Sequence, residues 1–289
     1  MIQQNKVFSV LGGDLRQICV AKSLFMDGYH VQLYAFDQYD GDLDGIMCTS
    51  LEEALNGADY VILPLPYSRD GIFLNAPYSK QKVQLEQIYT HIMPWMMVLG
   101  GKIDMEQLHA HNIRGFDYYK REQLQVMNAA VTAEGAIQIA MEESSITIGG
   151  SKCLIIGYGR IGKILSQLLK GLKAEVTVTA RKSEDLAWIS ANGLSGYKTA
   201  EIRDIIEKYD FVFNTVPVQV IGEEELKNIN KECLLIDLAS APGGIDMQYA
   251  RECGVQTVWS LSLPGKVAPM TAGEIIKKTV VDIIQENQS

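Results

Sequence analysis

A glycine-rich turn at residues 157–162 has the residue types and spacing that most clearly suggest chemistry. The apolar stretch Cys153-Leu-Ile-Ile156 runs into Gly157-Tyr-Gly159-Arg-Ile-Gly162, a G-x-G-x-x-G pattern. In this pattern the first glycine permits a tight turn, the second lets a pyrophosphate approach the backbone, and the third lets a helix pack closely on the strand. The N–H groups at such a helix start attract anions. The turn therefore predicts a nicotinamide dinucleotide site that includes Arg160 and Ile161.

The residues that follow this turn indicate which nicotinamide cofactor binds. Ile164 to Leu172 continues as a helix with periodic apolar positions, and Ala174 to Ala180 alternates as a second strand. An NAD site places Asp or Glu at the end of that strand to hold the ribose 2′-hydroxyl. Here the chain has Arg181-Lys182-Ser183, 24 positions after Gly157. Two cations and a hydroxyl predict NADP, whose 2′-phosphate they would bind; a solvated pair of charges is the alternative.

The composition of the chain restricts its partners and its surroundings. Its 289 residues are enough for two domains, each with its own core. Lys and Arg total 26 against 35 Asp and Glu, and the formal net charge of -9 argues against nucleic acid as a partner. The five cysteines form no C-x-x-C pair, which predicts reduced thiols in a cytoplasmic protein, with no metal site. No apolar run approaches the roughly 20 residues that span a bilayer, so we expect no membrane partner.

The two halves of the chain repeat one plan. In the first half, Val7–Leu11 predicts a strand, Asp14–Asp27 a helix and His30–Phe36 a second strand. Further along, Asp59–Pro66 matches Asp210–Pro217 of the second half. Strands that alternate with helices predict an α/β fold of two Rossmann-like lobes with parallel sheets. We expect the arrangement of a two-lobed dehydrogenase, with an interdomain cleft.

The domain boundaries follow from this repeat. We expect a substrate-side domain of residues 1–127 with the C-terminal helix 273–289, an interdomain helix and hinge at 128–148, and an NADP-binding domain at 149–272. Thr132 to Glu142 is predicted as a helix with Thr132 as its N-cap. The first domain is not a second dinucleotide site. Its turn Gly12-Gly13-Asp14 lacks the third glycine, and it places a carboxylate, predicted to be an N-cap, where a phosphate would lie.

Loops after later strands of the second half are predicted to contact the cofactor. Asn and Thr side chains can bond ribose hydroxyls, and Pro fixes a turn. Ser240 either faces the nicotinamide or serves as a turn hydroxyl, and the pattern leaves both open. The stretch 263–273, with two prolines and two glycines, predicts a rigid loop. The predicted contacts in these loops are Asn214, Thr215, Val216, Pro217, Ser240, Val267 and Ala268.

Two local resemblances point to dehydrogenases without fixing the substrate. Asn128–Glu134 resembles the start of the interdomain helix of D-2-hydroxyacid dehydrogenases. Their chemistry requires an Arg and a His in later loops, whereas this chain has no Arg near Ala241 and no histidine after His111. Ketone–alcohol hydride transfer would therefore lack its proton partner. The loop at 263–271 resembles that of methylenetetrahydrofolate dehydrogenases.

Short motifs along the whole chain are specific when taken together. They are Gly12–Gln17, Thr132–Gly135, Gly157–Gly162, Asp237–Ser240 with Pro242–Gly244, and Leu263–Gly265 with Val267–Pro269 and Thr271–Gly273. Together they resemble the A subunits of dipicolinate synthase from endospore-forming bacteria, with a departure at Ala241, where family members can carry Arg. The resemblance implies NADP-dependent oxidation of dihydrodipicolinate to pyridine-2,6-dicarboxylate. It also implies a flavoprotein-like B subunit as partner and a homo-oligomer.

The resemblance further implies a substrate with two carboxylates, for which the loops must offer cations. Arg16 lies in the most family-specific motif, and Arg69, Lys102 and Lys266 follow predicted strand ends; each alone is equally well explained as a surface charge. The pattern identifies no catalytic group. Glu134 and Lys266 are the candidates, although Glu134 also suits the start of a helix for dipole reasons.

Two other functions remain open from the sequence. One is an NADP-dependent dehydrogenase of another small carboxylate or of a folate-like substrate. The other is a non-catalytic subunit that senses NADP, because no strong acid–base candidate stands out. Turnover of the nicotinamide distinguishes an enzyme from a sensor.

Overall fold

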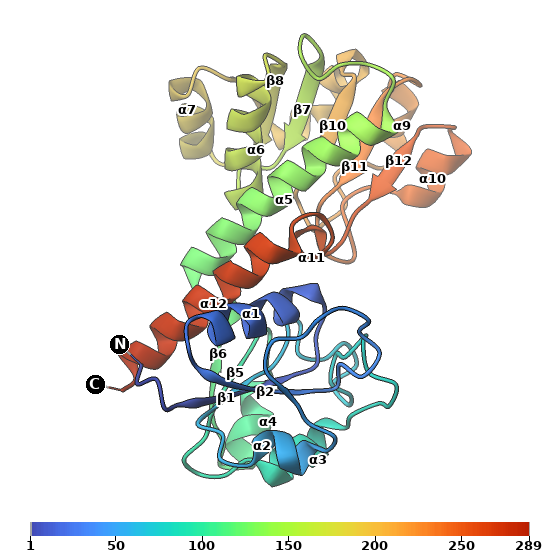
Figure 1. Ribbon diagram of the computed structural model, residues 1–289. Coiled ribbons are helices and arrows are strands. Elements are labelled where there is room, and N and C mark those ends of the chain that lie inside the picture. The colour runs from blue at the N-terminus through green and yellow to red at the C-terminus, as the bar shows by residue number, and fades with distance from the viewer. Residues whose placement is uncertain (1, 289) are drawn as a thin grey trace. The chain divides into compact units, whose positions relative to one another are not determined.

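The computed structural model describes residues 2–288, and the chain divides into two compact units. Of the described residues, 2–127 and 268–288 form the first unit, and 128–267 form the second. Each unit contains a six-stranded sheet in which every pairing is parallel (Figure 1). The predicted α/β fold with two Rossmann-like lobes is therefore confirmed.

The sheet of the first unit has the strand order β3-β2-β1-β4-β5-β6. Its strands are β1 (Val7–Leu11), β2 (His30–Tyr34), β3 (Ile46–Met47), β4 (Tyr60–Ile62), β5 (Met97–Gly100) and β6 (Arg114–Asp117). Its helices are α1 (Leu15–Met26), α2 (Leu51–Leu55), α3 (Leu85–His91), α4 (Met105–Ala110), the short 3-10 turn η1 (Tyr118–Lys120) and α12 (Pro269–Glu286). This order, with the first strand central and the chain winding outward to both sides, is that of a dinucleotide-binding fold.

The sheet of the second unit has the equivalent order β12-β11-β10-β7-β8-β9. Its strands are β7 (Lys152–Ile156), β8 (Glu175–Ala180), β9 (Ser195–Lys198), β10 (Phe211–Asn214), β11 (Leu234–Asp237) and β12 (Thr257–Trp259). Its helical segments are α6 (Arg160–Gly171), α7 (Ser183–Ala191), η2 (Thr199–Glu201), α8 (Ile202–Ile205), η3 (Ile206–Lys208), α9 (Glu223–Asn228), α10 (Met247–Glu252) and α11 (Leu263–Val267). The order reverses between β7 and β10, which is where ligands bind in such sheets.

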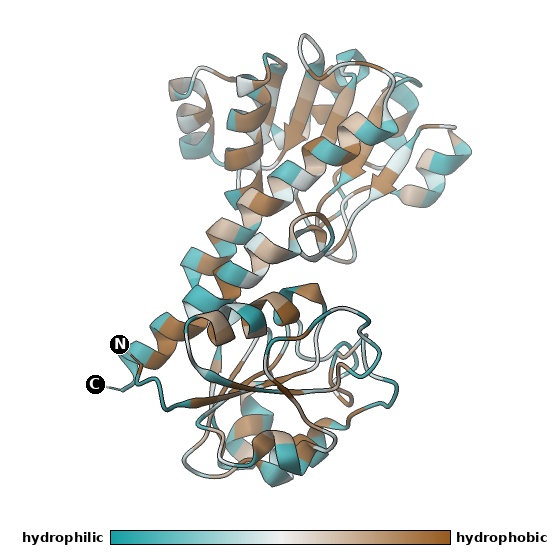
Figure 2. Cartoon of the chain, in the orientation of Figure 1, coloured by the Kyte–Doolittle hydropathy of each residue, from teal (hydrophilic) through white to brown (hydrophobic). Residues whose placement is uncertain are grey.

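Burial explains why these strands form. Both faces of a parallel sheet are covered by helices, so its central strands are apolar throughout. The side chains of β10 and β11 are all buried, as are those of β7 after Lys152. Figure 2 shows these strands in brown, with hydrophilic bands on the helices that cover them.

The long helix α5 (Glu122–Glu143) corrects one prediction. Thr132 was expected to cap a helix that starts there, but it lies inside α5, and its hydroxyl donates to the carbonyl of Asn128 at 2.8 Å. The apolar pattern explains the earlier start, because Leu124 and Ala129 are buried like the later Ala133 and Ala136. No proline interrupts the segment between residues 122 and 143.

The C-terminal helix α12 packs against α1 within the first unit, and Figure 1 shows the two side by side. Their contact is close at Gly273. A Cβ atom there would lie 2.6 Å from the Cβ of Cys19 and 2.7 Å from the carbonyl oxygen of Arg16. A side chain at position 273 would collide with α1, so this close approach of α12 to α1 requires glycine there.

We predict that Gly273→Ala destabilises the chain by about 1–3 kcal/mol, because the added methyl group overpacks the α1–α12 contact. The measurement is the free energy of unfolding in urea. Gly171→Ala is the control, because a Cβ at Gly171 meets nothing within 4 Å. Equal stability of the two variants would contradict the account of this contact.

Candidate dinucleotide site

The three glycines of the turn after β7 have three different surroundings. Gly157 has a positive φ of 100°, and a Cβ there would lie 2.5 Å from the Thr215 hydroxyl oxygen. A Cβ on Gly162 would lie 2.1 Å from the carbonyl oxygen of Gly157, so only glycine lets α6 start so close to the strand. A Cβ on Gly159 would meet nothing within 4 Å. The turn is thus tight at both ends and open at its centre.

The open centre is the start of α6. Gly159 is the N-cap of the helix, and no side chain caps it. The first N–H groups of a helix lack partners within the helix and form an anion site together with its dipole. Arg160 is exposed, Ile161 is half-buried and the backbone of both belongs to this first turn. A pyrophosphate fits the open space, so the residues present suit a dinucleotide.

The predicted cations lie directly after β8, beside a further cation, Lys198, that the sequence analysis did not identify. Arg181, Lys182 and Ser183 are all exposed after Ala180. Lys198, at the end of β9, pairs with Ala180 in the sheet. The ammonium group of Lys198 donates to the Ser183 hydroxyl at 2.9 Å and to the Arg181 carbonyl oxygen at 3.3 Å. Lys198 therefore lies against the segment 181–183, and these four residues form a cationic cluster at the ends of β8 and β9.

The loops after β10 and β11 are held together by one buried carboxylate. Asp237 is completely buried and accepts hydrogen bonds from the Asn214 amide (2.8 Å), the Ala239 backbone N–H (3.0 Å) and the Gly244 backbone N–H (2.8 Å). Such charge-assisted bonds are stronger than those between neutral groups. Asp237 therefore fixes the shape of this edge of the sheet.

This network corrects the predicted role of Asn214. Its side chain is completely buried, donates to the Val216 carbonyl oxygen as well as to Asp237, and accepts from the Val216 N–H. Its amide groups support the loop, so they are not offered to a ribose. The neighbouring Thr215 hydroxyl donates to the Ile156 carbonyl oxygen at 2.8 Å.

The other predicted contacts of these loops differ in exposure. Thr215 and Val216 are half-buried, whereas Pro217 and Ser240 are exposed. The carbonyl oxygen of Ser240 accepts from the Gly243 N–H at 2.9 Å. Its hydroxyl is accessible, so the structure leaves Ser240 available to a ligand.

The stretch 263–273 is helical where a loop was expected. Leu263–Val267 forms α11 and α12 starts at Pro269. Prolines are tolerated in the first turn of a helix, where Pro264 and Pro269 both lie. Val267 is half-buried and lies 3.1 Å from a Cβ built on Gly135 of α5, so its side chain packs against that helix. Ala268 is half-buried and Lys266 is exposed.

Glu134 lies apart from the glycine turn. It is exposed on α5 and lines a shallow groove with Leu168, Gly171 and Leu172, at the end of α6 opposite to Gly159. Twelve residues of helix separate the two ends, roughly 18 Å. The structure does not bring Glu134 to the dinucleotide turn.

Arg16 in the first unit is largely engaged within the protein. It is 7% exposed, and its guanidinium forms a two-pronged ion pair with Asp14 and donates to the Leu65 carbonyl oxygen at 2.5 Å. Asp14 also caps α1 by accepting from the Arg16 backbone N–H, as predicted. The pair thus lies at the start of α1, directly after the first glycine turn.

Arg69 and Lys102 remain accessible in the first unit. Lys102 follows β5 with a positive φ of 58°, and its N–H donates to Asp117 at 2.9 Å. Its ammonium group lies 5.0 Å from the centre of the Tyr119 ring. A non-glycine residue in this conformation is uncommon, and Lys102 is one of five among the described residues.

The two most deeply buried cysteines of the second unit, Cys153 and Cys233, are unsuited to nucleophilic chemistry. All five are free thiols, as the sequence predicts. Burial raises the pKa of Cys153 to about 11 and that of Cys233 to about 12. A reactive thiol requires a lowered pKa, so these two act as core residues.

Comparison with known proteins identifies the family. A curated relative, the dipicolinate synthase A subunit of Bacillus subtilis (strain 168), is 30% identical over 286 residues, which cover 97% of this chain and 96% of the relative. Residues 7–120 match the model of the N-terminal domain of dipicolinate synthase A subunits. The chain belongs to the family of dipicolinate synthase A subunits. Residues 128–262 match the NAD binding domain of S-adenosyl-L-homocysteine hydrolase, which indicates a nicotinamide cofactor and a dehydrogenase-like role.

Solved structures agree with this family. The dipicolinate synthase A subunit from Bacillus halodurans superposes with a TM-score of 0.88 at 28% identity, covering 98% of both chains. Its counterpart from Bacillus subtilis gives the same TM-score and identity, covering 100% of this chain and 98% of its own. A transhydrogenase from Sinorhizobium meliloti, 17% identical with a TM-score of 0.71, covering 98% of this chain and 94% of its own, shares the fold. Among the described residues, no helix has the length and apolar character needed to cross a bilayer.

We predict that Gly159→Ala weakens dinucleotide binding by about tenfold or more without lowering the thermal unfolding temperature. The added methyl group would enter the open space at the start of α6 and meet the pyrophosphate, not the protein. Binding is measured by isothermal titration with NADP and with NAD. Gly171→Ala, at the other end of α6, should bind both cofactors as the parent chain does. Unchanged affinity in Gly159→Ala would contradict the placement of the pyrophosphate.

Proposed function

We propose that the chain is the NADP-dependent A subunit of a dipicolinate synthase that oxidises dihydrodipicolinate to pyridine-2,6-dicarboxylate together with a B subunit. Full-length membership in the family of dipicolinate synthase A subunits supports the substrate and the partner. The single structural observation that carries the cofactor choice is the cationic cluster at the ends of β8 and β9.

The cationic cluster favours NADP for an electrostatic reason. An NAD site requires a carboxylate at the end of the second strand, and Arg181 occupies that position here. Arg181 and Lys198 would hold the 2′-phosphate by charge-assisted hydrogen bonds, with Lys182 adding charge. Ser183 would serve as the hydroxyl donor, oriented by Lys198. Because Lys198 is half-buried and already bonded to Ser183, part of the cluster is ordered in advance.

The proposed reaction removes two electrons from a dihydropyridine ring. One ring C–H bond breaks with its electron pair as hydride, a proton leaves the ring, and the aromatic pyridine forms. When bound, NADP accepts the hydride and becomes NADPH. Aromatisation supplies driving force, so the reaction places a smaller demand on a dedicated histidine acid or base than ketone–alcohol chemistry does.

The residues of the chain have defined tasks in this proposal. Gly159 and the backbone of Arg160 and Ile161 bind the pyrophosphate, and Asp237 holds the surrounding loops in place. Accessible cations must bind the two substrate carboxylates. With Arg16 engaged by Asp14, the candidates are Arg69, Lys102 and Lys266.

The direct test supplies enzymatically generated dihydrodipicolinate and NADP to the chain alone, and then with a B subunit. NADPH and dipicolinate absorbance are followed together. Product formed in step with NADPH, in either mixture, supports the proposed reaction. NADP binding without product in both mixtures contradicts it and favours another substrate or a sensing role.

We predict that Arg181→Ala and Lys198→Ala each weaken NADP binding by about ten- to a hundredfold while NAD binding stays almost unchanged. Each removes a charged hydrogen-bond donor to the 2′-phosphate, an interaction worth roughly 1–3 kcal/mol. Titration of both cofactors into both variants makes the comparison. Lys231→Ala, which removes an exposed lysine of the same unit outside the glycine turn and the cationic cluster, is the control. Equal losses for NADP and NAD would contradict the phosphate assignment.

A further inference from the structure

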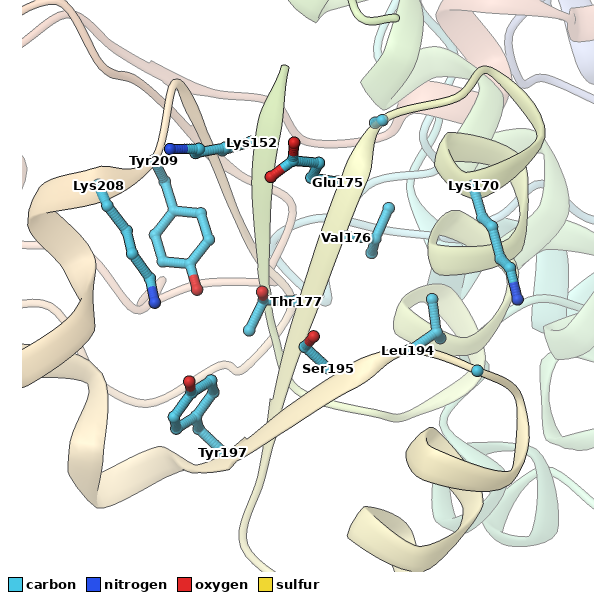
Figure 3. A pocket seen from close by; sticks show the side chains of 12 residues that line it. Lys152, Lys170, Glu175, Val176, Thr177, Leu194, Ser195, Tyr197, Lys208 and Tyr209 are labelled. Atoms are coloured by element: carbon cyan, nitrogen blue, oxygen red, sulfur yellow. The ribbon is translucent and has the colours of Figure 1, made fainter. Parts of the chain in front are cut away.

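A second polar groove in the second unit lies away from the dinucleotide turn. Its volume is about 760 Å³, and it is bounded by the first residues of β7, β8 and β9 (Lys152, Glu175 and Ser195) and by Lys208 and Tyr209 after η3. Figure 3 shows these side chains around a common space. The glycine turn and Arg181 lie at the other ends of β7 and β8. Five residue steps along β8 separate those ends, roughly 17 Å.

The alternation of β8 explains why this space is polar. Val176, Val178 and Ala180 face the core beneath α6 and α7. The opposite face carries Glu175 and Thr177, and β9 adds Ser195, the partner of Thr177 in the sheet. A parallel sheet covered on both faces is normally apolar on both. The alternation thus places carboxylate and hydroxyl groups of β8 and β9 along the groove, beside the apolar Val176 that also lines it.

Tyr209 contributes a buried hydroxyl to the groove. The residue is 2% exposed, and its hydroxyl lies beside Thr177 but makes no hydrogen bond of normal geometry. Buried polar atoms are nearly always hydrogen-bonded, and one without a partner calls for an explanation. Burial raises the pKa of Tyr209, so the hydroxyl remains a donor at neutral pH. In Figure 3 it points into the groove.

Lysine residues give the groove a positive charge. Lys208 places its ammonium group 5.4 Å from the Tyr197 ring centre and 5.5 Å from that of Tyr209, which holds the cation at the groove. Lys152 and Lys170 also line it, although the Lys170 ammonium group already donates to the Asn192 carbonyl oxygen at 2.7 Å. Glu175 is the one carboxylate among the described lining residues. The lining residues of the groove therefore carry more positive than negative charge, although the net charge of the whole chain is -9.

We propose that this groove binds a small organic or inorganic anion through its carboxylate or phosphate group. The anion bridges the Lys208 ammonium group and the Tyr209 hydroxyl, Lys152 adds charge, and a planar body lies against the Tyr197 ring. The groove has the size of an ordinary small-molecule site. This inference does not depend on the proposed reaction, because no residue of the groove belongs to the dinucleotide turn.

The test titrates two probes into the full-length chain by calorimetry in a phosphate-free, low-salt buffer. Inorganic phosphate represents the phosphate source, and benzene-1,3-dicarboxylate represents a planar carboxylate. We expect saturable binding of at least one probe. Lys208→Ala should weaken it by about tenfold or more and Tyr209→Phe by about three- to tenfold, because each removes a hydrogen-bond donor to the anion.

Lys231→Ala is the matched control, since Lys231 is an exposed lysine of the same unit whose ammonium group bonds only the Cys253 carbonyl oxygen among described contacts. It should bind both probes as the parent chain does. Circular dichroism of all variants verifies folding, and Tyr209→Phe preserves the packing of the ring. Absence of saturable binding by both probes, or equal affinity in the parent, Lys208→Ala and Tyr209→Phe chains, would overturn the proposal.

Discussion

The dinucleotide site depends on the close approach of α6 to the end of β7. A side-chain carbon on Gly162 would lie 2.1 Å from the Gly157 carbonyl oxygen, so the helix can begin there only because residue 162 is glycine. Gly157 is required for a different reason, its positive φ of 100°. This approach leaves the first N–H groups of α6 facing open space at Gly159. The neighbouring loops keep their shape because the buried Asp237 carboxylate accepts three N–H groups, one from Asn214 at the end of β10 and two from the loop after β11. Backbone geometry, more than any one side chain, thus defines the anion site.

The first unit has the same topology, but its first helix, α1, does not begin at an open glycine turn. Its strand order is equivalent to that of the second unit, and Gly12 and Gly13 make a turn after its central strand β1. There the helix start is filled by Asp14, which caps α1 and pairs with the buried Arg16. A carboxylate repels phosphate where the open Gly159 admits it. The same strand order therefore gives an open helix start in one unit and a filled one in the other.

The sequence predicts the fold and the glycine turn well, because apolar strands and glycine spacing are local signals. Lys198 escaped notice because its role depends on β9 lying beside β8, a contact between residues 15 positions apart that no local pattern reveals. The motif around Arg16 likewise does not show that its guanidinium turns back to Asp14. Asn214 was misjudged for a similar reason, since its partner Asp237 lies 23 positions away. Side-chain pairing across strands decides which polar residues remain available to ligands.

The most direct test of the central claim is a crystal structure of the chain with NADP bound. We expect the pyrophosphate against the N–H groups of Gly159, Arg160 and Ile161, and the 2′-phosphate within about 3.2 Å of the side chains of Arg181 and Lys198. A pyrophosphate placed elsewhere, or a 2′-phosphate that projects into solvent away from both side chains, would contradict the account.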